Sequence, residues 1–412
     1  MGFADVVKKI EDSKNDIIEL ERGLVAIPAL SPTYDAPPEQ TGEAPKTAFL
    51  KQYLEQHGFT DLVEINAPDD RVPGGVRPNL IARIKGKTSV GTTWVMAHTD
   101  VVPPGDMEKW TTEPFELKVD GDRIYGRGVE DNHQGIVAGV MAARALLETG
   151  TTPPRDLAIL FVADEECGSD YGIRYVLDNE NPFTENDIII VPDGGAADGS
   201  EIEVAEKSIM WIKFHVAGEQ CHASMPDKGV NAMRAGANLI VRLDELNTIF
   251  GKADPVFEPK TSTFEPTKKE ANVPNVNTIP GEDVFCYDCR VLPDYPLADV
   301  EAKIDEICKS VAQEYGVEVK FEFIQKEEAA PATSKDAAVV GLVRDAVREV
   351  HGVEARVIGI GGGTVAAFLR RKGLPCVVWS TMEETMHGPD ENALISNMIK
   401  DAKVIAHIAL AE

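Results

Sequence analysis

The stretch MAHTDVVPPGD places His98 and Asp100 two residues apart, at the point where an apolar run gives way to a loop rich in Pro and Gly. Side chains two residues apart at a strand end point to the same side. The Asp100 carboxylate can therefore hold the second nitrogen of the His98 imidazole and fix its tautomer, as the partners of metal-bound histidines do. Taken alone, the pair is a weak signal, and a chance pair or a structural hydrogen bond is the first interpretation.

Further ionisable residues follow other apolar runs. Asp131 lies in GRGVEDNHQG, where its alternative role is a helix N-cap. Glu165 and Glu166 are neighbours in ADEECGS, and two adjacent carboxylates repel each other unless a cation or a shared proton offsets the repulsion. Asp193 in VPDGG and His387 in TMHGPDE complete the set.

Nitrogen and oxygen donors of this kind suit two divalent ions bridged by one carboxylate. Zinc fits them best, with cobalt or manganese as alternatives. Two such ions lower the pKa of a shared water, and Glu165 could then take its proton and return it to a leaving amine. The candidate ligands are His98, Asp131, Glu166, Asp193 and His387.

The elements that position these residues have the pattern of an α/β fold. The runs TTWVMAH, DLAILFVA and NDIIIVP are apolar without alternation, which is typical of parallel strands buried on both faces. Residues 134–150 carry an apolar stripe at helical spacing and stop at a Gly. Ligands of such sheets bind outside the carboxyl ends of the strands, where the candidate residues fall.

The segment 207–324 has a different pattern. IKFHV and VEVKFEFI alternate strictly between apolar and polar residues, which indicates a sheet with one wet face. Between them the spacing predicts a helix over 230–250, strands over 276–280 and 284–292, and a second helix near 300–311. This order is the split βαβ arrangement of a small α+β domain. We therefore expect a catalytic domain in two parts, 1–206 and 325–412, interrupted by an inserted domain over 207–324.

Composition excludes several classes of protein. The net charge of −28 makes nucleic acids and anionic membranes poor partners. No apolar run reaches the roughly 20 residues of a membrane span, and the N-terminal residues do not form a secretory signal. Six scattered cysteines indicate a reducing compartment, so we expect a cytoplasmic protein.

The chain also resembles a known family. The motifs HTDVVPPGD, GRGVEDNHQG, DEECGS, PDGG, GEQCHASMPDKGVNA, DCRVLP, GIGGGT and HGPDEN occur in the order seen in the dinuclear zinc amidohydrolases and peptidases. That family includes succinyl-diaminopimelate desuccinylase, acetylornithine deacetylase, aminoacylase, carnosinase and the glutamate carboxypeptidases. The resemblance implies a zinc-peptidase-like catalytic domain with a mainly parallel sheet, and an inserted ferredoxin-like domain that acts as lid and homodimer interface.

The resemblance also implies roles for the metal-site residues. It implies that His98 and Asp193 bind one zinc, that Glu166 and His387 bind the other, and that Asp131 bridges the two. Asp100 would then orient His98, and Glu165 would be the general base.

Residues outside this set receive roles from the resemblance as well. His222 in CHASMP resembles the histidine that reaches across a dimer interface to the oxyanion, against the alternative of a surface loop residue. Asn277 and Arg290 resemble positions near the substrate, although strand-edge hydrogen bonding and a surface ion pair explain them equally well. GIGGGT lacks the spacing of a dinucleotide site. Its Gly362, Gly363 and Thr364 form either a nest for the substrate's carboxylate or a tight turn.

One departure concerns the segment after Asp131, where many members of the family carry Lys-Gly and this chain has His133 and Gln134. His133 either adds a pH-sensitive group or caps the following helix, and capping is the interpretation we favour.

We expect hydrolysis of the amide bond of a small N-acyl amino acid, of the succinyl-diaminopimelate desuccinylase or acetylornithine deacetylase type. A dipeptidase or carboxypeptidase with the same site is the alternative. A binding protein that kept the fold but lost the chemistry would be expected to lack a ligand or the base, and all six residues are present.

Overall fold

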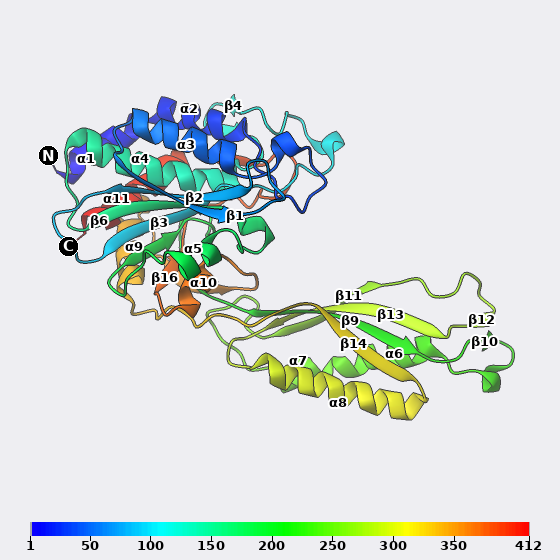
Figure 1. Cartoon of the computed structure of the whole chain (residues 1–412). Coiled ribbons are helices and arrows are strands. Elements are labelled where there is room, and N and C mark those ends of the chain that lie inside the picture. Colours follow the sequence, from blue (N-terminus) through cyan, green and yellow to red (C-terminus); the bar gives the residue numbers. More distant parts are fainter. Residues whose placement is uncertain (1, 412) are drawn as a thin grey trace. The chain divides into compact units, whose positions relative to one another are not determined.

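The computed structural model describes residues 2–411, and the chain divides into two compact units. The first unit comprises the chain up to Val204, Thr333–Val357 and the chain from Thr364 onward. The second unit comprises Ala205–Ala332 and Ile358–Gly363. Figure 1 shows the elements of both units.

The first unit is built on an eight-stranded sheet. Its strands, in spatial order, are β1 (Asp61–Pro68), β2 (Val76–Ile84), β6 (Asp156–Val162), β3 (Thr92–His98), β7 (Ile188–Val191), β16 (Cys376–Val378), β8 (Glu201–Glu206) and β15 (Arg356–Ile360). The four central strands β6, β3, β7 and β16 run parallel. β1, β2 and β8 pair antiparallel with their neighbours. The expected α/β class with a mainly parallel sheet is confirmed, and its parallel part is the centre.

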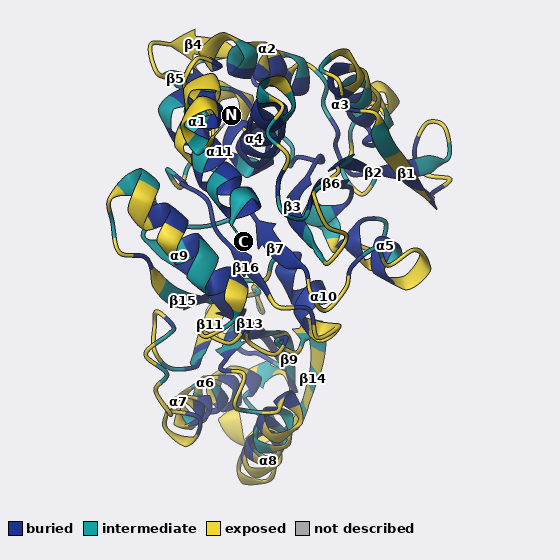
Figure 2. Cartoon of the chain, turned by 90° about the vertical axis from the view of Figure 1, so that its left-hand side faces the viewer, coloured by how far each residue is buried: buried dark blue, intermediate teal, exposed yellow. Residues whose placement is uncertain are grey.

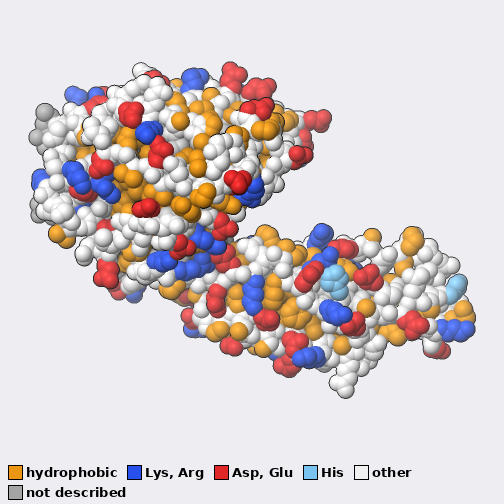
Figure 3. Space-filling view, in the orientation of Figure 1, with side chains coloured by type: hydrophobic (Ala, Val, Ile, Leu, Met, Phe, Trp, Pro, Cys, Tyr) orange, Lys and Arg blue, Asp and Glu red, His pale blue; other side chains and the backbone are white. Residues whose placement is uncertain are grey.

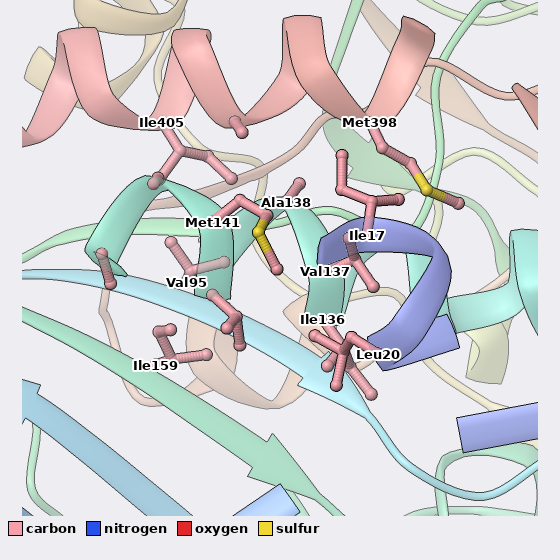
Figure 4. Packing of buried hydrophobic residues seen from close by; sticks show 14 of the residues in the cluster. Ile17, Leu20, Val95, Ile136, Val137, Ala138, Met141, Ile159, Met398 and Ile405 are labelled. Carbon is pink, nitrogen blue, oxygen red and sulfur yellow. The ribbon is translucent and has the colours of Figure 1, made fainter. Parts of the chain in front are cut away.

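Helices cover both faces of this sheet. Successive side chains of a strand point to opposite faces, so each central strand contributes side chains to both layers. On β3, Val95 packs with α1 (Phe3–Glu11), α2 (Lys14–Val25), α3 (Ala44–Gln56), α4 (Gln134–Thr149) and α11 (Ile395–Leu410). Figure 4 shows this core close by. Trp94 and Met96 of the same strand pack on the other side with α5 (Ile173–Asn179) and α10 (Ala366–Arg371). α9 (Ala338–His351) packs against α11.

α4 is the helix that follows the Asp131 motif. The helix is capped at its C-terminus by Gly150, whose left-handed φ of 63° ends the helix where the sequence predicted. Almost all of its residues are buried, as the dark blue ribbon in Figure 2 shows. The loop that precedes α4 is therefore attached to a buried helix of the core.

A small three-stranded sheet ties two loops of the site together. β5 (Arg123–Tyr125) lies between β4 (Lys118–Asp120) and β17 (Asn392–Leu394). Asn392 pairs with Tyr125, so the segment after His387 is held beside the segment before Asp131.

The second unit is an α+β fold. Its antiparallel sheet has the order β11 (Thr263–Lys269), β13 (Glu282–Val291), β9 (Ser208–Ala217) and β14 (Glu318–Glu327). One face packs on α6 (Ala232–Leu243), α7 (Glu245–Ile249) and α8 (Leu297–Tyr315). The alternation predicted for IKFHV is confirmed, because Ile212, Phe214 and Val216 are buried in this core. A short hairpin pairs β10 (Cys221–His222) with β12 (Thr278–Ile279).

One predicted strand of the second unit was wrong. The sequence favoured a sheet strand over 276–280, but only Thr278–Ile279 is extended there, and it pairs with β10 outside the main sheet. The sheet strand is Thr263–Lys269, which contains Pro266 and is mostly exposed. An edge strand with a Pro and few apolar residues lacks the alternation by which strands are predicted.

None of the helices within residues 2–411 combines the length and the hydrophobicity that a membrane span requires. Asp and Glu side chains are spread over the visible face of each unit, with Lys and Arg among them (Figure 3).

Candidate metal centre

The structure brings the five candidate ligands together in two groups that share Asp131. The first group is His98, Asp131 and Asp193, and the second is Asp131, Glu166 and His387. Within each group, one ligand atom per residue lies within 4.8 Å of the others.

Asp131 presents one oxygen to each group. Its Oδ1 lies 2.8 Å from Nε2 of His98, and its Oδ2 lies 3.0 Å from Nε2 of His387. Nε2 of His98 is also 3.6 Å from Oδ1 of Asp193, and Nε2 of His387 is 3.2 Å from Oε2 of Glu166. This geometry suits a carboxylate that bridges two cations.

Four elements deliver these side chains to the carboxyl edge of the parallel strands. His98 is the last residue of β3, Glu166 follows β6, Asp193 follows β7, and Asp131 precedes α4. The sequence predicted this placement, because the carboxyl ends of neighbouring parallel strands meet at one edge of a sheet.

The two histidines differ in exposure. The side chain of His98 is 1% exposed, whereas that of His387 is 52% exposed. The site is therefore closed on the side of His98 and open on the side of His387.

The electrostatics of the cluster fit bound cations. Burial raises the pKa of Glu166 to about 7 and also raises the pKa values of Asp193 and Glu165, since each carboxylate is desolvated beside others. Burial lowers the pKa of His98, but the carboxylates of Asp193 and Asp131 raise it more. Oε1 of Glu166 is buried without a hydrogen-bond partner in the described chain. Cations would satisfy both the crowded carboxylates and this unpaired acceptor.

Asp100 differs from expectation in what its carboxylate does. Nδ1 of His98 lies 3.0 Å from the backbone carbonyl of Asp100, whereas the carboxylate Oδ1 is 3.6 Å away. The carboxylate instead accepts the backbone N–H groups of Glu165 and Glu166, each at 3.0 Å. Asp100 thus orients the ring through its main chain. Its side chain fixes the turn that carries the two glutamates.

The structure reveals supporting residues that sequence reasoning missed. The buried carboxylate of Glu391 accepts the N–H groups of Gly128, Glu130 and Asp131 at 2.9–3.1 Å, and it pairs with Arg127. Glu391 therefore clamps the loop that presents Asp131. Its signal was its place in HGPDEN, the motif that contributed His387.

Two polar residues beside Asp131 were also missed. Nδ2 of Asn132 donates to Oδ1 of Asp193 at 2.8 Å, which holds that carboxylate in the first group. The carboxylate of Glu130 accepts the N–H of Thr385 and its hydroxyl, and this fixes the loop before His387. His387 has φ of 60°, a conformation that costs a non-Gly residue on the order of 1–3 kcal/mol and persists only where neighbours enforce it.

Three buried charged residues support the turn that carries Glu165. The guanidinium of Arg77, fully buried, pairs with the carboxylates of Glu43 and Asp164. Glu43 in turn accepts the N–H of Asp164 at 3.3 Å. Because Asp164 directly precedes Glu165, this triad supports the position of Glu165, the candidate base. Nothing in the apolar context of Arg77 in VRPNLIARI signalled such a role.

The other predicted residues lie mostly in the second unit. Nδ1 of His222 accepts the backbone N–H of Ser224 at 3.1 Å, and its ring is exposed. Asn277 accepts a hydrogen bond from Asn275 and lies in the same hairpin. Arg290 makes two hydrogen bonds to Asp288 and one to the carbonyl of Gly361, so its observed contacts are those of the ion-pair alternative.

The glycine-rich segment, Gly359–Thr364, has free space beside its backbone at Gly362 and Gly363. A Cβ added at Gly363 would meet nothing within 4 Å, and one at Gly362 would touch only the Ile360 side chain at 3.8 Å. Oγ1 of Thr364 accepts the N–H of Ala366 at 3.2 Å, at the start of α10.

The capping role that we favoured for His133 was wrong. Its side chain makes no capping hydrogen bond to α4, and its ring contacts Lys46 instead.

Comparisons with known proteins agree with this geometry. The family model described as peptidase family M20/M25/M40 matches residues 94–411. A metallohydrolase from Methanococcus maripaludis is 38% identical over 96% of this chain and 98% of its own. A succinyl-diaminopimelate desuccinylase from Pelagibacter ubique is 26% identical, with 95% and 97% covered.

Solved structures share the fold. Aminopeptidase PepT from Bacillus cereus superposes with a TM-score of 0.76 at 19% identity, covering 96% of this chain and 97% of its own. A dinuclear metal-binding peptidase from Bacillus subtilis has a TM-score of 0.67 at 17% identity, with 97% and 98% covered.

The fold and the paired groups of carboxylates and imidazoles define a metallohydrolase. More particularly, the chain belongs to peptidase family M20/M25/M40.

Proposed function

We propose that this protein hydrolyses the amide bond of a small N-acyl amino acid with two divalent metal ions. The observation that carries the proposal is the position of Asp131, with Oδ1 toward His98 and Oδ2 toward His387. His98 and Asp193 would hold one ion, Glu166 and His387 the other, and Asp131 would bridge them. Zinc suits these donors best, with cobalt or manganese as alternatives.

The bound ions would supply Lewis acidity and a water of lowered pKa. Glu165 takes the proton of the attacking water and later delivers it to the leaving amine. Its backbone N–H is fixed by Asp100 at 3.0 Å, so the base is held by a buried partner on a rigid turn. The raised pKa of Glu165, which burial causes, makes its carboxylate a stronger base than one in water.

His222 is the residue that we propose for the oxyanion. Because the backbone N–H of Ser224 donates to Nδ1, a neutral ring carries its proton on Nε2. The exposed Nε2–H is then a donor that needs no change of tautomer. The dimer and lid roles of the second unit, with His222 acting across the interface, belong to the same proposal.

The substrate class rests on the relatives. Desuccinylases match over nearly the whole chain, so we place succinyl-diaminopimelate or acetylornithine type substrates first. Dipeptides are the alternative, since human carnosine dipeptidase 1 shares the fold with a TM-score of 0.74. Asn277, Gly362, Gly363 and Thr364 are our candidates for contacts with the substrate's carboxylate. Arg290 hydrogen-bonds to Asp288 and to the carbonyl of Gly361, so we propose that it supports the glycine-rich segment rather than contacting the substrate directly.

The experiment is amide hydrolysis by metal-stripped protein and by protein reloaded with zinc, cobalt or manganese. N-succinyl-diaminopimelate, N-acetylornithine and simple dipeptides form one panel. We expect metal-restored cleavage of an N-acyl amino acid. Cleavage of dipeptides alone selects the alternative, and no turnover of any substrate with two ions bound contradicts the proposal.

A further inference from the structure

Three ionisable side chains are buried together behind the loop of Asp131. They are Glu21 of α2, Lys46 of α3 and His133, the residue before α4, and each is at most 1% exposed. None belongs to the metal groups or has a role in the chemistry proposed above. Burying such groups is costly unless they are paired with one another.

The three groups form a chain of contacts. Nζ of Lys46 lies 2.9 Å from Nε2 of His133, and Nδ1 of His133 lies 3.6 Å from Oε2 of Glu21. Burial lowers the pKa of Lys46 to about 7, while the carboxylates of Asp100 and Glu21 favour its charged form. In its charged form Lys46 only donates hydrogen bonds, so Nε2 of His133 is the acceptor in the 2.9 Å contact. The ring proton then sits on Nδ1, on the side of the Glu21 carboxylate, which at 3.6 Å is too far away for a hydrogen bond.

The ring of His133 also packs against the loop itself. Its backbone N–H donates to the carbonyl of Gly128 at 2.9 Å, which closes the loop 128–133. Gly128 has φ of 92°, and a Cβ at this position would lie 2.7 Å from Cε1 of the His133 ring. Only a glycine leaves room for the ring there.

The loop is thus held at Gly128 by two different groups. The Glu391 carboxylate accepts the N–H of Gly128 at 2.9 Å, and the ring of His133 occupies the space that a Cβ of Gly128 would need. Asp131 lies in the loop between Gly128 and His133. A ring free to rotate would remove one of the two contacts at Gly128.

We propose that Lys46 is a positioning residue for the metal loop. Its amine fixes the tautomer and orientation of His133, and the fixed ring, backed by Glu21, holds the segment that presents Asp131. The inference rests on the metal centre proposed above, and it extends that centre to a helix with no metal ligand of its own.

The first test is zinc affinity, measured by competition with a chelating dye, which needs no substrate. Lys46→Met keeps the length of the side chain and removes the donor. We expect zinc affinity to be weaker by about 10-fold, the lower end of the range seen when a direct partner of a metal ligand is lost, because Lys46 acts through His133. The matched control is Lys51→Met on the same helix, whose amine pairs with Glu64 at the surface. It should leave zinc affinity unchanged.

A double-mutant cycle separates positioning from a general loss of packing. If Lys46 acts through His133, the double variant Lys46→Met/His133→Gln should bind zinc no more weakly than His133→Gln alone. Additive losses would show that Lys46 acts by another route. Unchanged zinc affinity in folded Lys46→Met would overturn the inference and leave the proposed function intact.

The second test needs no variant, so it stands even if Lys46→Met does not fold. The ¹⁵N spectrum of the wild-type histidine rings should show His133 protonated at Nδ1 with Nε2 as acceptor. A ring protonated at Nε2 would overturn the chain of contacts. Wild-type protein that binds no zinc would instead contradict the metal centre itself, and the ring spectrum would still show whether the chain exists.

Discussion

Asp100 and Glu165 are joined by a hydrogen bond in which the carboxylate Oδ1 of Asp100 accepts the backbone N–H of Glu165 at 3.0 Å. The second oxygen accepts the N–H of Glu166 at the same distance. One buried carboxylate therefore sets the turn on which a proposed base and a proposed ligand stand side by side. The neighbouring carbonyl of Asp100 orients His98, so a single residue links both metal groups.

Asp100→Asn tests this link. An amide can accept only one of the two N–H groups and turns an N–H donor toward the other, which leaves a buried donor unpaired. We expect a loss of about 1–3 kcal/mol in the free energy of unfolding and a lower kcat, both from the same change. Urea unfolding and steady-state kinetics measure the two effects. Asp120→Asn on the exposed strand β4 is the control, and equal behaviour of both variants would contradict the role of Asp100.

Glu165→Gln tests the base. The substitution keeps size and backbone contacts but removes the proton acceptor. We expect kcat to fall by about 10²–10⁴-fold, the contribution typical of general acid–base catalysis, with both metal ions retained. Turnover and metal content should be measured on one preparation. Loss of metal together with activity would move Glu165 from base to ligand.

The sequence predicted the central strands and the five residues of the two metal groups. This was feasible because apolar runs without alternation have few interpretations, and polar residues at their ends must meet at one edge. The edge strand Thr263–Lys269 could not be predicted, since a mostly exposed strand carries little apolar signal. The pairing of Arg77 with Glu43 was missed for another reason: it joins segments far apart in the chain, and no local pattern encodes it. Glu391 lies in the HGPDEN motif, but the motif does not reveal that its carboxylate accepts the N–H groups of the Asp131 loop.

Asp401 makes stability depend on pH. Burial raises its pKa to about 7, although the N–H and hydroxyl of Thr381 donate to its carboxylate and favour the charged form. The native state therefore holds this proton more tightly than the unfolded chain, whose Asp residues titrate near 3.9. The contribution of Asp401 to stability is full below about pH 4 and is lost as the pH rises to about 7 and beyond.

Asp401→Asn should remove this dependence. We expect the free energy of unfolding of the variant, relative to wild type, to increase between pH 5 and pH 8. Urea titrations at the two values measure it, and exposed Asp345→Asn on α9 is the control because its carboxylate pairs with Arg348 at the surface. A difference between variant and wild type that is constant with pH would contradict a raised pKa for Asp401.

His222 supplies the test of the proposed dimer. Its ring is exposed in the hairpin of β10 and β12, with Nε2 as the available donor, and the five candidate metal ligands and Glu165 all belong to the other unit. If His222 serves the site of a second protomer, subunits with His222→Ala and subunits with Glu165→Gln are each inactive as homodimers. A hybrid of the two contains one site with both an intact base and an intact histidine. We expect mixed and refolded subunits to recover up to about one quarter of wild-type activity, since random pairing makes half of the dimers hybrids with one complete site each.

Subunit exchange should be confirmed by mass spectrometry of differently tagged chains. Hybrids that form and stay inactive would show that His222 serves its own subunit or has no part in the reaction, and activity of the His222→Ala homodimer would separate these two outcomes.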